Sequence, residues 1–239
     1  MNVQIQGANG VLDIPGNGSA SVYYHGSWQK IDGVNANNRK MVQATLEPGT
    51  YTFAATYDGT RDSQVVTVGA SAKTVYFQAA AVTLGLQNHS GSSLAADSAS
   101  YYAGQWNTMA GAQAEMLPGT YSFAATYNGT RQQQNFTIVK PNSNNQANRY
   151  QTAGFQTTLV NVQLSDSNKA IVSGSASYYA NGWHAITGVN HNNPKMVQAE
   201  MLPGTYSFAA VYDNVRQQKN GVTIGTGNAN HIQSVYFGF

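Results

Sequence analysis

Tyrosine and tryptophan recur as a spaced pair three times along this chain. The pairs are Tyr24 with Trp28, Tyr102 with Trp106 and Tyr179 with Trp183, and successive tryptophans lie 78 and 77 residues apart. A three-residue loop inside each pair would close a hairpin and set the tyrosine opposite the tryptophan on one face. Aromatic faces stack on the apolar C–H faces of sugar rings, so the pairs are candidate binding residues for a polysaccharide or cell-surface glycan.

The alternation of side chains indicates that these pairs face solvent. The residues in phase with the tyrosines are Ala20 and Val22 in the first copy and serines in the other two. The opposite phase should form the core; it holds Tyr23, Tyr101, Tyr178, Ile31, Met109 and Ile186. Three exposed pairs would bind a polymer with avidity. Alternatively, each pair only clamps its own hairpin or packs against the neighbouring copy.

An arginine recurs as well, four residues after the tyrosine that ends a later strand. The three copies are Arg61, Arg131 and Arg216. These side chains are candidates for contacting an acidic sugar. The favoured interpretation is structural: a turn arginine that pairs with Asp58 or Asp213, or that stacks on a tyrosine.

A long repeated string divides the chain. Leu-Glu-Pro-Gly-Thr-Tyr-Thr-Phe-Ala-Ala-Thr-Tyr begins at Leu46, and close copies begin at Met116 and Met201. A period of about 80 residues is typical of small tandem domains. The predicted domains are therefore 1–80, 81–158 and 159–239.

Each copy has the pattern of a small β-sandwich. Tyr51, Phe53, Ala55 and Tyr57 alternate with smaller residues and should face the core. Pro48-Gly49 predicts a type II turn with a positive φ at the glycine, and Asp58-Gly59 and Asn128-Gly129 predict hairpin turns. The leading tyrosine after the Pro-Gly turn, at 51, 121 and 206, predicts a tyrosine corner.

The chain resembles the prealbumin-like, CnaB-type immunoglobulin-like repeats of bacterial surface and secreted proteins. An opening Val-Asn-Val-Gln-Leu strand and the later Leu-Pro-Gly-Thr-Tyr-Ser-Phe string carry this resemblance over all three copies. It implies three immunoglobulin-like sandwiches that build stalks or adhesin shafts. Many members carry an internal isopeptide bond from a first-strand lysine. The strands around Val3, Val82 and Val160 have no lysine, so no such crosslink is expected.

Composition argues against several classes of function. Only 9% of residues are charged, the net charge is +2 and there is no cysteine. Without a basic stripe we expect no nucleic-acid binding, and without a long apolar run no membrane insertion. The few glutamates form no repeated pair of the kind that glycosidases use, so we expect no enzyme and no catalytic residue. The scattered histidines show no metal-ligand spacing and are expected at the surface, and no cofactor or metal is expected.

The sequence thus predicts an all-β protein of three tandem immunoglobulin-like sandwiches, with short connections that favour a stiff, elongated array. We expect a non-enzymatic structural or adhesive module of a secreted or cell-surface protein, with further repeats of the same chain as neighbours. One alternative is a carbohydrate-binding module that uses the Tyr–Trp pairs. Another is self-assembly into a filament through sheet edges, which low charge permits.

Overall fold

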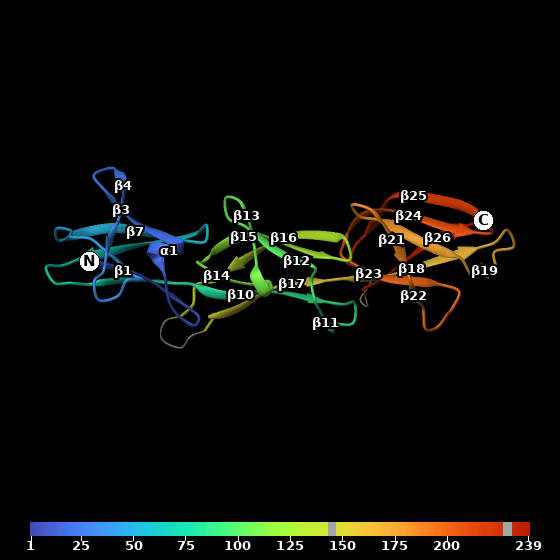
Figure 1. Ribbon diagram of the computed structural model, residues 1–239, viewed down its shortest axis with the longest axis horizontal. Coiled ribbons are helices and arrows are strands. Elements are labelled where there is room, and N and C mark those ends of the chain that lie inside the picture. Colours follow the sequence, from blue (N-terminus) through green and yellow to red (C-terminus); the bar gives the residue numbers. More distant parts are fainter. Residues whose placement is uncertain (143–146, 227–230) are drawn as a thin grey trace. The chain divides into compact units, whose positions relative to one another are not determined.

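The computed structural model describes residues 1–142, 147–226 and 231–239, and most of these lie in strands (Figure 1). By its contacts the chain divides into two compact units. Unit 1 comprises Met1–Thr83, Ser100–Phe123 and Gln134–Ala153, and unit 2 comprises Leu84–Ala99, Ala124–Gln133 and Gly154–Phe239. Each unit contains one junction between successive repeats. We call the junction of the first and second repeats junction 1, and that of the second and third repeats junction 2.

The first repeat contains nine strands and one short helix within the described residues. They are β1 (Asn2–Gly7), β2 (Gly10–Leu12), α1 (Ile14–Asn17), β3 (Gly18–Tyr24), β4 (Ser27–Lys30), β5 (Gly33–Val34), β6 (Val42–Gln43), β7 (Gly49–Tyr57), β8 (Thr60–Val68) and β9 (Thr74–Gln78).

The other two repeats have a similar order of elements. The second has β10 (Ala80–Gln87), β11 (Ser93–Leu94), β12 (Ser98–Tyr102), β13 (Trp106–Thr108), the 3-10 helix η1 (Ala110–Ala112), β14 (Gln113–Met116), β15 (Gly119–Tyr127), β16 (Thr130–Ile138) and β17 (Tyr150–Gln156). The third has β18 (Thr158–Ser165), β19 (Ile171–Val172), β20 (Ser175–Tyr179), β21 (Trp183–Ile186), β22 (Gly188–Val189), β23 (Val197–Met201), β24 (Gly204–Tyr212), β25 (Val215–Ile224) and β26 (Ile232–Gly238).

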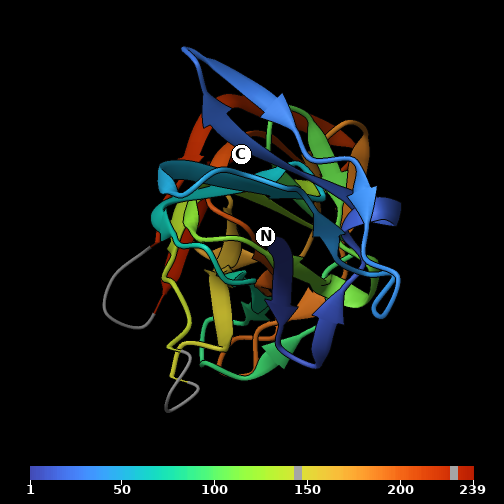
Figure 2. The same ribbon diagram turned by 90° about the vertical axis from the view of Figure 1, so that its left-hand side faces the viewer.

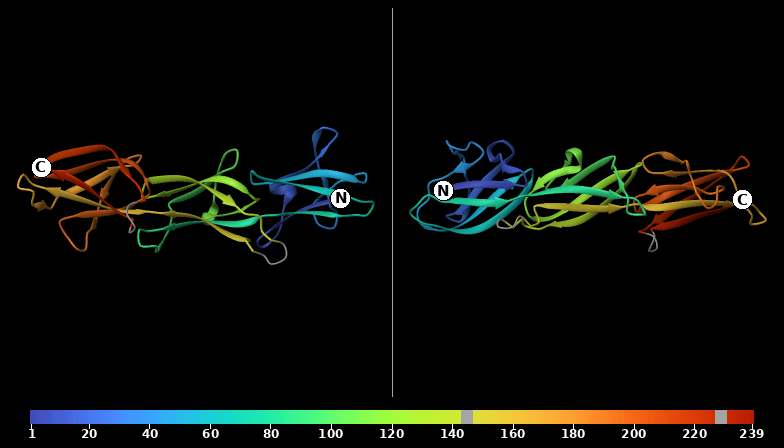
Figure 3. Two further views of the ribbon diagram at one scale, coloured as in Figure 1. Left: turned by 180° about the vertical axis from the view of Figure 1, so that it is seen from behind. Right: turned by 90° about the horizontal axis from the view of Figure 1, so that it is seen from below.

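Two sheets make each sandwich, so the all-β prediction is confirmed. In the first repeat the orders are β2-β1-β6-β5, with β9 beside β1, and β4-β3-β7-β8. Figure 2 faces this repeat, and its blue β3–β4 hairpin stands out from the rest of the sandwich. The third repeat has β19-β18-β23-β22, with β26 beside β18, and β21-β20-β24-β25; Figure 3 shows its orange-to-red strands in two layers. The second has β11-β10-β14, with β17 beside β10, and β13-β12-β15-β16.

The last strand of the first and third repeats runs parallel to the first strand of the same repeat, which sequence analysis did not predict. Val3 lies opposite Val75 in the first repeat, and Val162 lies opposite Val235 in the third. Because the strands are parallel, the chain leaves a repeat at the end where its first strand also finishes. Single connecting residues then start the next repeat: the N–H of Ala79 donates to Gln6 O and that of Thr157 to Gln87 O, both at 2.9 Å.

The core follows the predicted alternation. Phe53, Ala55 and Tyr57 are buried in the first repeat's cluster, which also takes Val3 and Phe77 from the other sheet. Similar phenylalanines, Phe123 and Phe208, are fully buried in the other repeats. These large side chains hold the two sheets together through the apolar area that they remove from water.

The predicted tyrosine corners are present, but the glycine before each has a different role from the one predicted. The hydroxyls of Tyr51, Tyr121 and Tyr206 donate to the carbonyls four residues earlier, at 2.9, 3.0 and 2.7 Å. Gly49 and Gly204 begin strands in extended conformation and have no positive φ. The type II turn predicted at Pro48-Gly49 is therefore wrong.

Glycine is required there because the corner tyrosine lies over it. A Cβ atom added to Gly204 would stand 2.7 Å from the hydroxyl oxygen of Tyr206, and one added to Gly119 would stand 2.8 Å from that of Tyr121. The hairpin turns are as predicted. Asp58 and Gly59 have φ of 44° and 79°, and Asn128 and Gly129 have 48° and 74°, as a type I′ turn requires.

Replacing Tyr206 by phenylalanine should lower the free energy of unfolding by about 1 kcal/mol, because the buried carbonyl of Leu202 loses its donor. Guanidinium chloride unfolding followed by circular dichroism measures the change. The matched variant Tyr51→Phe should cost less, because its hydrogen bond lies at the surface. Equal losses in the two variants would contradict this account of the corner.

Candidate functional site

The second and third repeats carry the Tyr–Trp pair as predicted. Tyr102 lies opposite Trp106, and Tyr179 lies opposite Trp183. In both pairs the ring centroids are 5.6 Å apart and the rings meet edge to face. All four side chains are exposed, with the tryptophans at 42% and 45%. The edge-to-face contact leaves much of each ring open to solvent.

In the first repeat the partner of the tryptophan is Tyr23, not Tyr24. Tyr23 lies opposite Trp28 with centroids 5.5 Å apart, whereas Tyr24 lies opposite Ser27 and stacks on His25. The loop is a two-residue turn, His25-Gly26, with positive φ at both residues. The prediction that Tyr24 faces Trp28 is therefore wrong.

An extra residue causes this shift. The string Ser-Ala-Ser is followed by Val-Tyr-Tyr in the first repeat and by Tyr-Tyr in the others. Val22 therefore takes the buried place of Tyr101 and Tyr178, and Ala20 is buried with it. Tyr23, at 45% exposure, is pushed to the outer face. In this repeat the predicted phase is wrong for β3, although Ile31 is buried and Trp28 is exposed as predicted. The phase holds in the other two repeats, and aligning on Ser-Ala-Ser instead of Tyr-Tyr would have corrected β3.

The recurring arginines join the aromatic pairs on the outer face. The guanidinium carbon of Arg61 lies 4.7 Å from the ring centroid of Trp28, and that of Arg216 lies 5.1 Å from Trp183. Arg131 holds the corresponding place on β16 and is exposed. Arg61 and Arg216 thus stack on a tryptophan, whereas the structural interpretation had expected a tyrosine or a turn aspartate as the partner.

A small residue shares the outer face with this stack. In the third repeat Tyr179, the partner of Trp183, lies beside Ser207, and Arg216 lies beside Val211. Ala209 is between these two positions on the same face. It is 2% exposed although its register places it on the outer face with the arginine and the tryptophan. Arg216 is further held by donating to Gln218 Oε1 at 3.0 Å. We call each Tyr–Trp pair with its arginine an aromatic platform.

An open groove of about 730 Å³ borders the third platform within unit 2. Trp183, His184 and Thr187 line it from the third repeat, and Asp97 and Asn128 line it from the second. Its walls are mostly polar, with carboxylates, amides and hydroxyls beside the aromatic rings of Tyr127, Tyr178 and Trp183. This combination suits a hydroxyl-rich ligand.

One buried leucine forms the centre of each junction. Leu117 is fully buried and belongs to the core cluster of the first repeat. Its N–H donates to Thr60 Oγ1 at 3.0 Å, and the Thr60 hydroxyl donates to Tyr57 O at 2.7 Å.

Junction 2 repeats this arrangement. Leu202 is also fully buried, and its N–H donates to Thr130 Oγ1 at 3.1 Å. The Thr130 hydroxyl donates in turn to Tyr127 O at 2.6 Å.

A second contact joins a tyrosine to the preceding hairpin turn. Tyr101 donates to Asp58 O at 2.8 Å in junction 1, and Tyr178 donates to Asn128 O at 2.7 Å in junction 2. Burial, and then the nearby Asp58 carboxylate, raises the pKa of Tyr101 to about 12. Burial also raises the pKa of Tyr178. Both phenols therefore stay protonated and donate near neutral pH.

A glutamate makes the third contact. Both carboxylate oxygens of Glu115 accept from the N–H of Ala8, at 3.1 and 3.2 Å. In junction 2 the Glu200 carboxylate accepts from the N–H of His89 at 3.3 Å, and also contacts the His89 ring and the Thr157 hydroxyl. Burial raises the pKa of Glu115, while the Ala8 N–H and the Arg149 charge oppose that rise. Sequence analysis missed the role of these two glutamates, because the partner of each lies about a hundred residues away.

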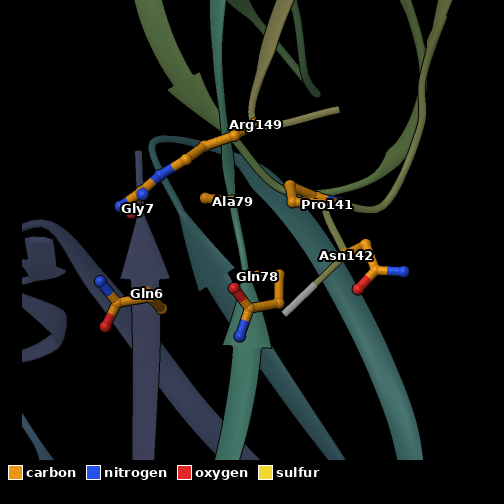
Figure 4. Close-up of a pocket in the computed structure, with 7 residues that line it drawn as sticks. All are labelled: Gln6, Gly7, Gln78, Ala79, Pro141, Asn142 and Arg149. Atoms are coloured by element: carbon orange, nitrogen blue, oxygen red, sulfur yellow. Dashed lines mark hydrogen bonds between the residues drawn. The ribbon is translucent and has the colours of Figure 1, made fainter. Parts of the chain in front are cut away.

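Arg149 borders a small cavity of about 230 Å³ beside junction 1 (Figure 4). Its side chain reaches to Gly7 and donates to the backbone oxygen at 3.3 Å. Gln6, Gln78 and Pro141 complete the walls. The arginine thus ties a late loop of the second repeat to the first strand of the first repeat.

The described part of the chain contains no cluster of three or more metal-ligating side chains. No helix in that part is long and apolar enough to cross a membrane. His89 and His184 are half-buried at junction 2, which corrects the prediction that the histidines lie at the surface. His184 stacks on Tyr178 with centroids 5.2 Å apart.

No protein-family model matches this sequence, and no curated protein matches it. Solved structures show a distant similarity to β-domains of pilins and adhesins. The Bacillus anthracis TIE protein is 10% identical with a TM-score of 0.25, over all of this chain and 50% of its own. BcpA, the major pilin subunit of Bacillus cereus, is 11% identical with a TM-score of 0.23, over 100% and 98%. The pilus adhesin SpaC from Lactobacillus rhamnosus GG is 10% identical with a TM-score of 0.28, over 100% and 43%. The chain thus spans half or less of TIE and SpaC.

Alkaline pH should destabilise the chain through the junction tyrosines. The pKa of Tyr101 is about 12 in the folded chain against 10.0 ordinarily, so its stabilising effect is complete below pH 10 and is lost as the pH rises to about 12. The free energy of unfolding, measured by urea titration at steps from pH 8 to 12, should fall less steeply for Tyr101→Phe than for wild type. Identical slopes would contradict the assignment.

Proposed function

We propose that this chain is a non-enzymatic repeat region of a secreted or cell-surface protein and that it acts as a stiff structural or adhesive module. The observation that carries the proposal is the burial of Leu117 and Leu202 at the two junctions. Flexibly linked domains join through exposed polar segments with few contacts. Here a leucine of each following repeat is fully buried at the junction, and in junction 1 it belongs to the preceding repeat's core.

The connecting residues add to this support. Ala79 and Thr157 are buried, and each donates its N–H to the preceding repeat. A hinge would have to break these hydrogen bonds and expose the leucine. Burial of a leucine side chain contributes about 1.5–3 kcal/mol, so an open junction is a minor state. The small charged fraction of the sequence suits a stalk-like module outside the cell. Because the chain has no cysteine, its stability depends on buried cores and not on disulfides.

Distances between spin labels across a junction test stiffness. The chain has no cysteine, so Ser63→Cys with Thr108→Cys reports on junction 1 and Gln133→Cys with Ala185→Cys reports on junction 2; all four positions are exposed. Pulsed electron–electron resonance should give one narrow distribution for each pair. The pair Ser27→Cys with Ser63→Cys, within the first repeat, supplies the width due to the labels alone.

A variant tests whether the width of the distance distribution depends on the junction contacts. Thr60→Val keeps the shape of the side chain and removes the acceptor of the Leu117 N–H, so it should broaden the distribution across junction 1 and leave junction 2 unchanged. Distributions in wild type that are several times wider than the label control would show hinged repeats and contradict the proposal.

We propose glycan binding by the aromatic platforms as the second candidate function. The supporting observation is an exposed Tyr–Trp pair that meets edge to face, with an arginine stacked on the tryptophan in the first and third repeats. The ring faces suit the C–H faces of sugars, and the guanidinium suits a carboxylate on an acidic sugar. Partners would be a polysaccharide or a cell-surface glycan. In the set of candidate glycan-binding residues Tyr23 takes the place of Tyr24. The other candidates are unchanged: Trp28, Tyr102, Trp106, Tyr179, Trp183, Arg61, Arg131 and Arg216.

Titration with soluble polysaccharides tests this second candidate. Neutral glucans and mannans and the acidic polymers alginate and hyaluronate should be compared by tryptophan fluorescence and by affinity electrophoresis. A saturable shift for one polymer is expected, with retardation lost in the triple variant Trp28→Ala, Trp106→Ala, Trp183→Ala and circular dichroism unchanged. If no polymer gives a response although acrylamide quenches the tryptophans of wild type, glycan binding is contradicted and only the proposed structural role remains.

A further inference from the structure

Each junction joins two faces that differ chemically. The docking face belongs to the following repeat and presents a glutamate, a leucine and a tyrosine: Glu115, Leu117 and Tyr101 in junction 1, and Glu200, Leu202 and Tyr178 in junction 2. The receiving face belongs to the preceding repeat and presents a glycine and a threonine of the hairpin turn: Gly59 and Thr60, or Gly129 and Thr130.

The glycine of the receiving face is required by close approach as well as by its positive φ. A Cβ atom added to Gly59 would stand 2.8 Å from the carbonyl oxygen of Ala103 in the next repeat. One added to Gly129 would stand 2.5 Å from His184 Nε2. A side chain at this position therefore collides with a docked repeat.

The docking face of the first repeat has lost all three groups. Alignment on the Pro-Gly string puts Thr45 at the place of the glutamate and Glu47 at the place of the leucine. Val22 replaces the tyrosine, as the register of β3 shows. Thr45 and Glu47 are both exposed. A carboxylate at the position that is fully buried in both junctions would have to lose its hydration for docking to occur.

The receiving face of the third repeat has lost both of its groups. Its turn reads Asp213-Asn214-Val215, so asparagine replaces the glycine and valine replaces the threonine. Asn214 keeps a positive φ of 60°, so the turn is preserved while the space is filled. Val215 is 56% exposed and offers no acceptor to an incoming N–H, which would stay unsatisfied when buried.

We propose that these five substitutions prevent a second copy of the chain from adding head to tail through the junction contact. Junctions 1 and 2 both have complete sets of contact residues. The docking face of the first repeat differs from these sets at all three positions, and the receiving face of the third repeat differs at both of its side-chain positions. A face that binds the next repeat of its own chain can also bind that repeat on another molecule, so these substitutions oppose head-to-tail association between chains. The surface at Asn214 and Val215 is thus a closed face and not a docking site for another copy.

Transferring the outer-face residues into junction 2 tests the proposal within one chain. The variant Gly129→Asn with Thr130→Val should raise the amide exchange rate of Leu202 about tenfold or more, measured by hydrogen–deuterium exchange and NMR. The exchange of Val162, in the core of the third repeat, should not change. The control Asn128→Asp gives the residue that the first repeat has at this position, and it should leave Leu202 protected. Unchanged exchange of Leu202 in the double variant would overturn the proposal.

Restoring the faces on separate molecules tests it between chains. One variant carries Thr45→Glu with Glu47→Leu, and the other carries Asn214→Gly with Val215→Thr. Sedimentation velocity should find an equimolar mixture associating about tenfold or more tightly than wild type does with itself. Each variant alone should stay as monomeric as wild type, since each has only one restored face.

The controls separate this contact from association through sheet edges. Residue 47 lies outside the strands and residue 215 is only the first of the ten residues of the edge strand β25, so edge pairing would appear to a similar extent in wild type, in each variant and in the mixture. A mixture that associates no more than its components overturns the proposal, and so does wild-type association that is abolished by Glu47→Arg.

Discussion

The backbone of one leucine links the cores of successive repeats. In junction 1 the N–H of Leu117 donates to Thr60, whose hydroxyl donates to Tyr57 O, while the carbonyl of Leu117 accepts from Tyr121. Both polar groups of a fully buried peptide are therefore satisfied, one by each repeat. Because a buried group without a partner is costly, the first repeat cannot leave without exposing the leucine or depriving its N–H of an acceptor.

The parallel pairing of first and last strands serves this junction. It brings the chain out beside the end of its own first strand, so one residue is enough to reach the next repeat. The same short reach sets the Leu-Pro-Gly turn of the next repeat against the hairpin turn of the previous one. The junction leucine, the glycine and the corner tyrosine then lie within five consecutive positions, and a single string of sequence carries both the fold of the repeat and its attachment.

The outer faces of the sheets are free of these constraints. Arg216 stacks on Trp183 on this outer face, and the tryptophan stays nearly half exposed. The junctions and the aromatic platforms thus use different surfaces of the same sandwich. A structural role and a binding role are physically compatible, and each is lost through different residues.

Much of this protein follows from its sequence alone. Repetition revealed three copies, period-two alternation predicted Phe53, Ala55 and Tyr57 as core, and turn chemistry predicted the hairpins at Asp58-Gly59 and Asn128-Gly129. These are local features, since they depend on residues that are close along the chain.

Tertiary structure alone decided the rest. The roles of Glu115 and Thr60, the parallel pairing of β1 with β9, and the glycine that lies under a tyrosine ring all involve atoms brought together from distant parts of the chain. Tyr23 took the place predicted for Tyr24 because one inserted residue inverts the faces of a strand, and pairing with the neighbouring strands determines where the inversion falls.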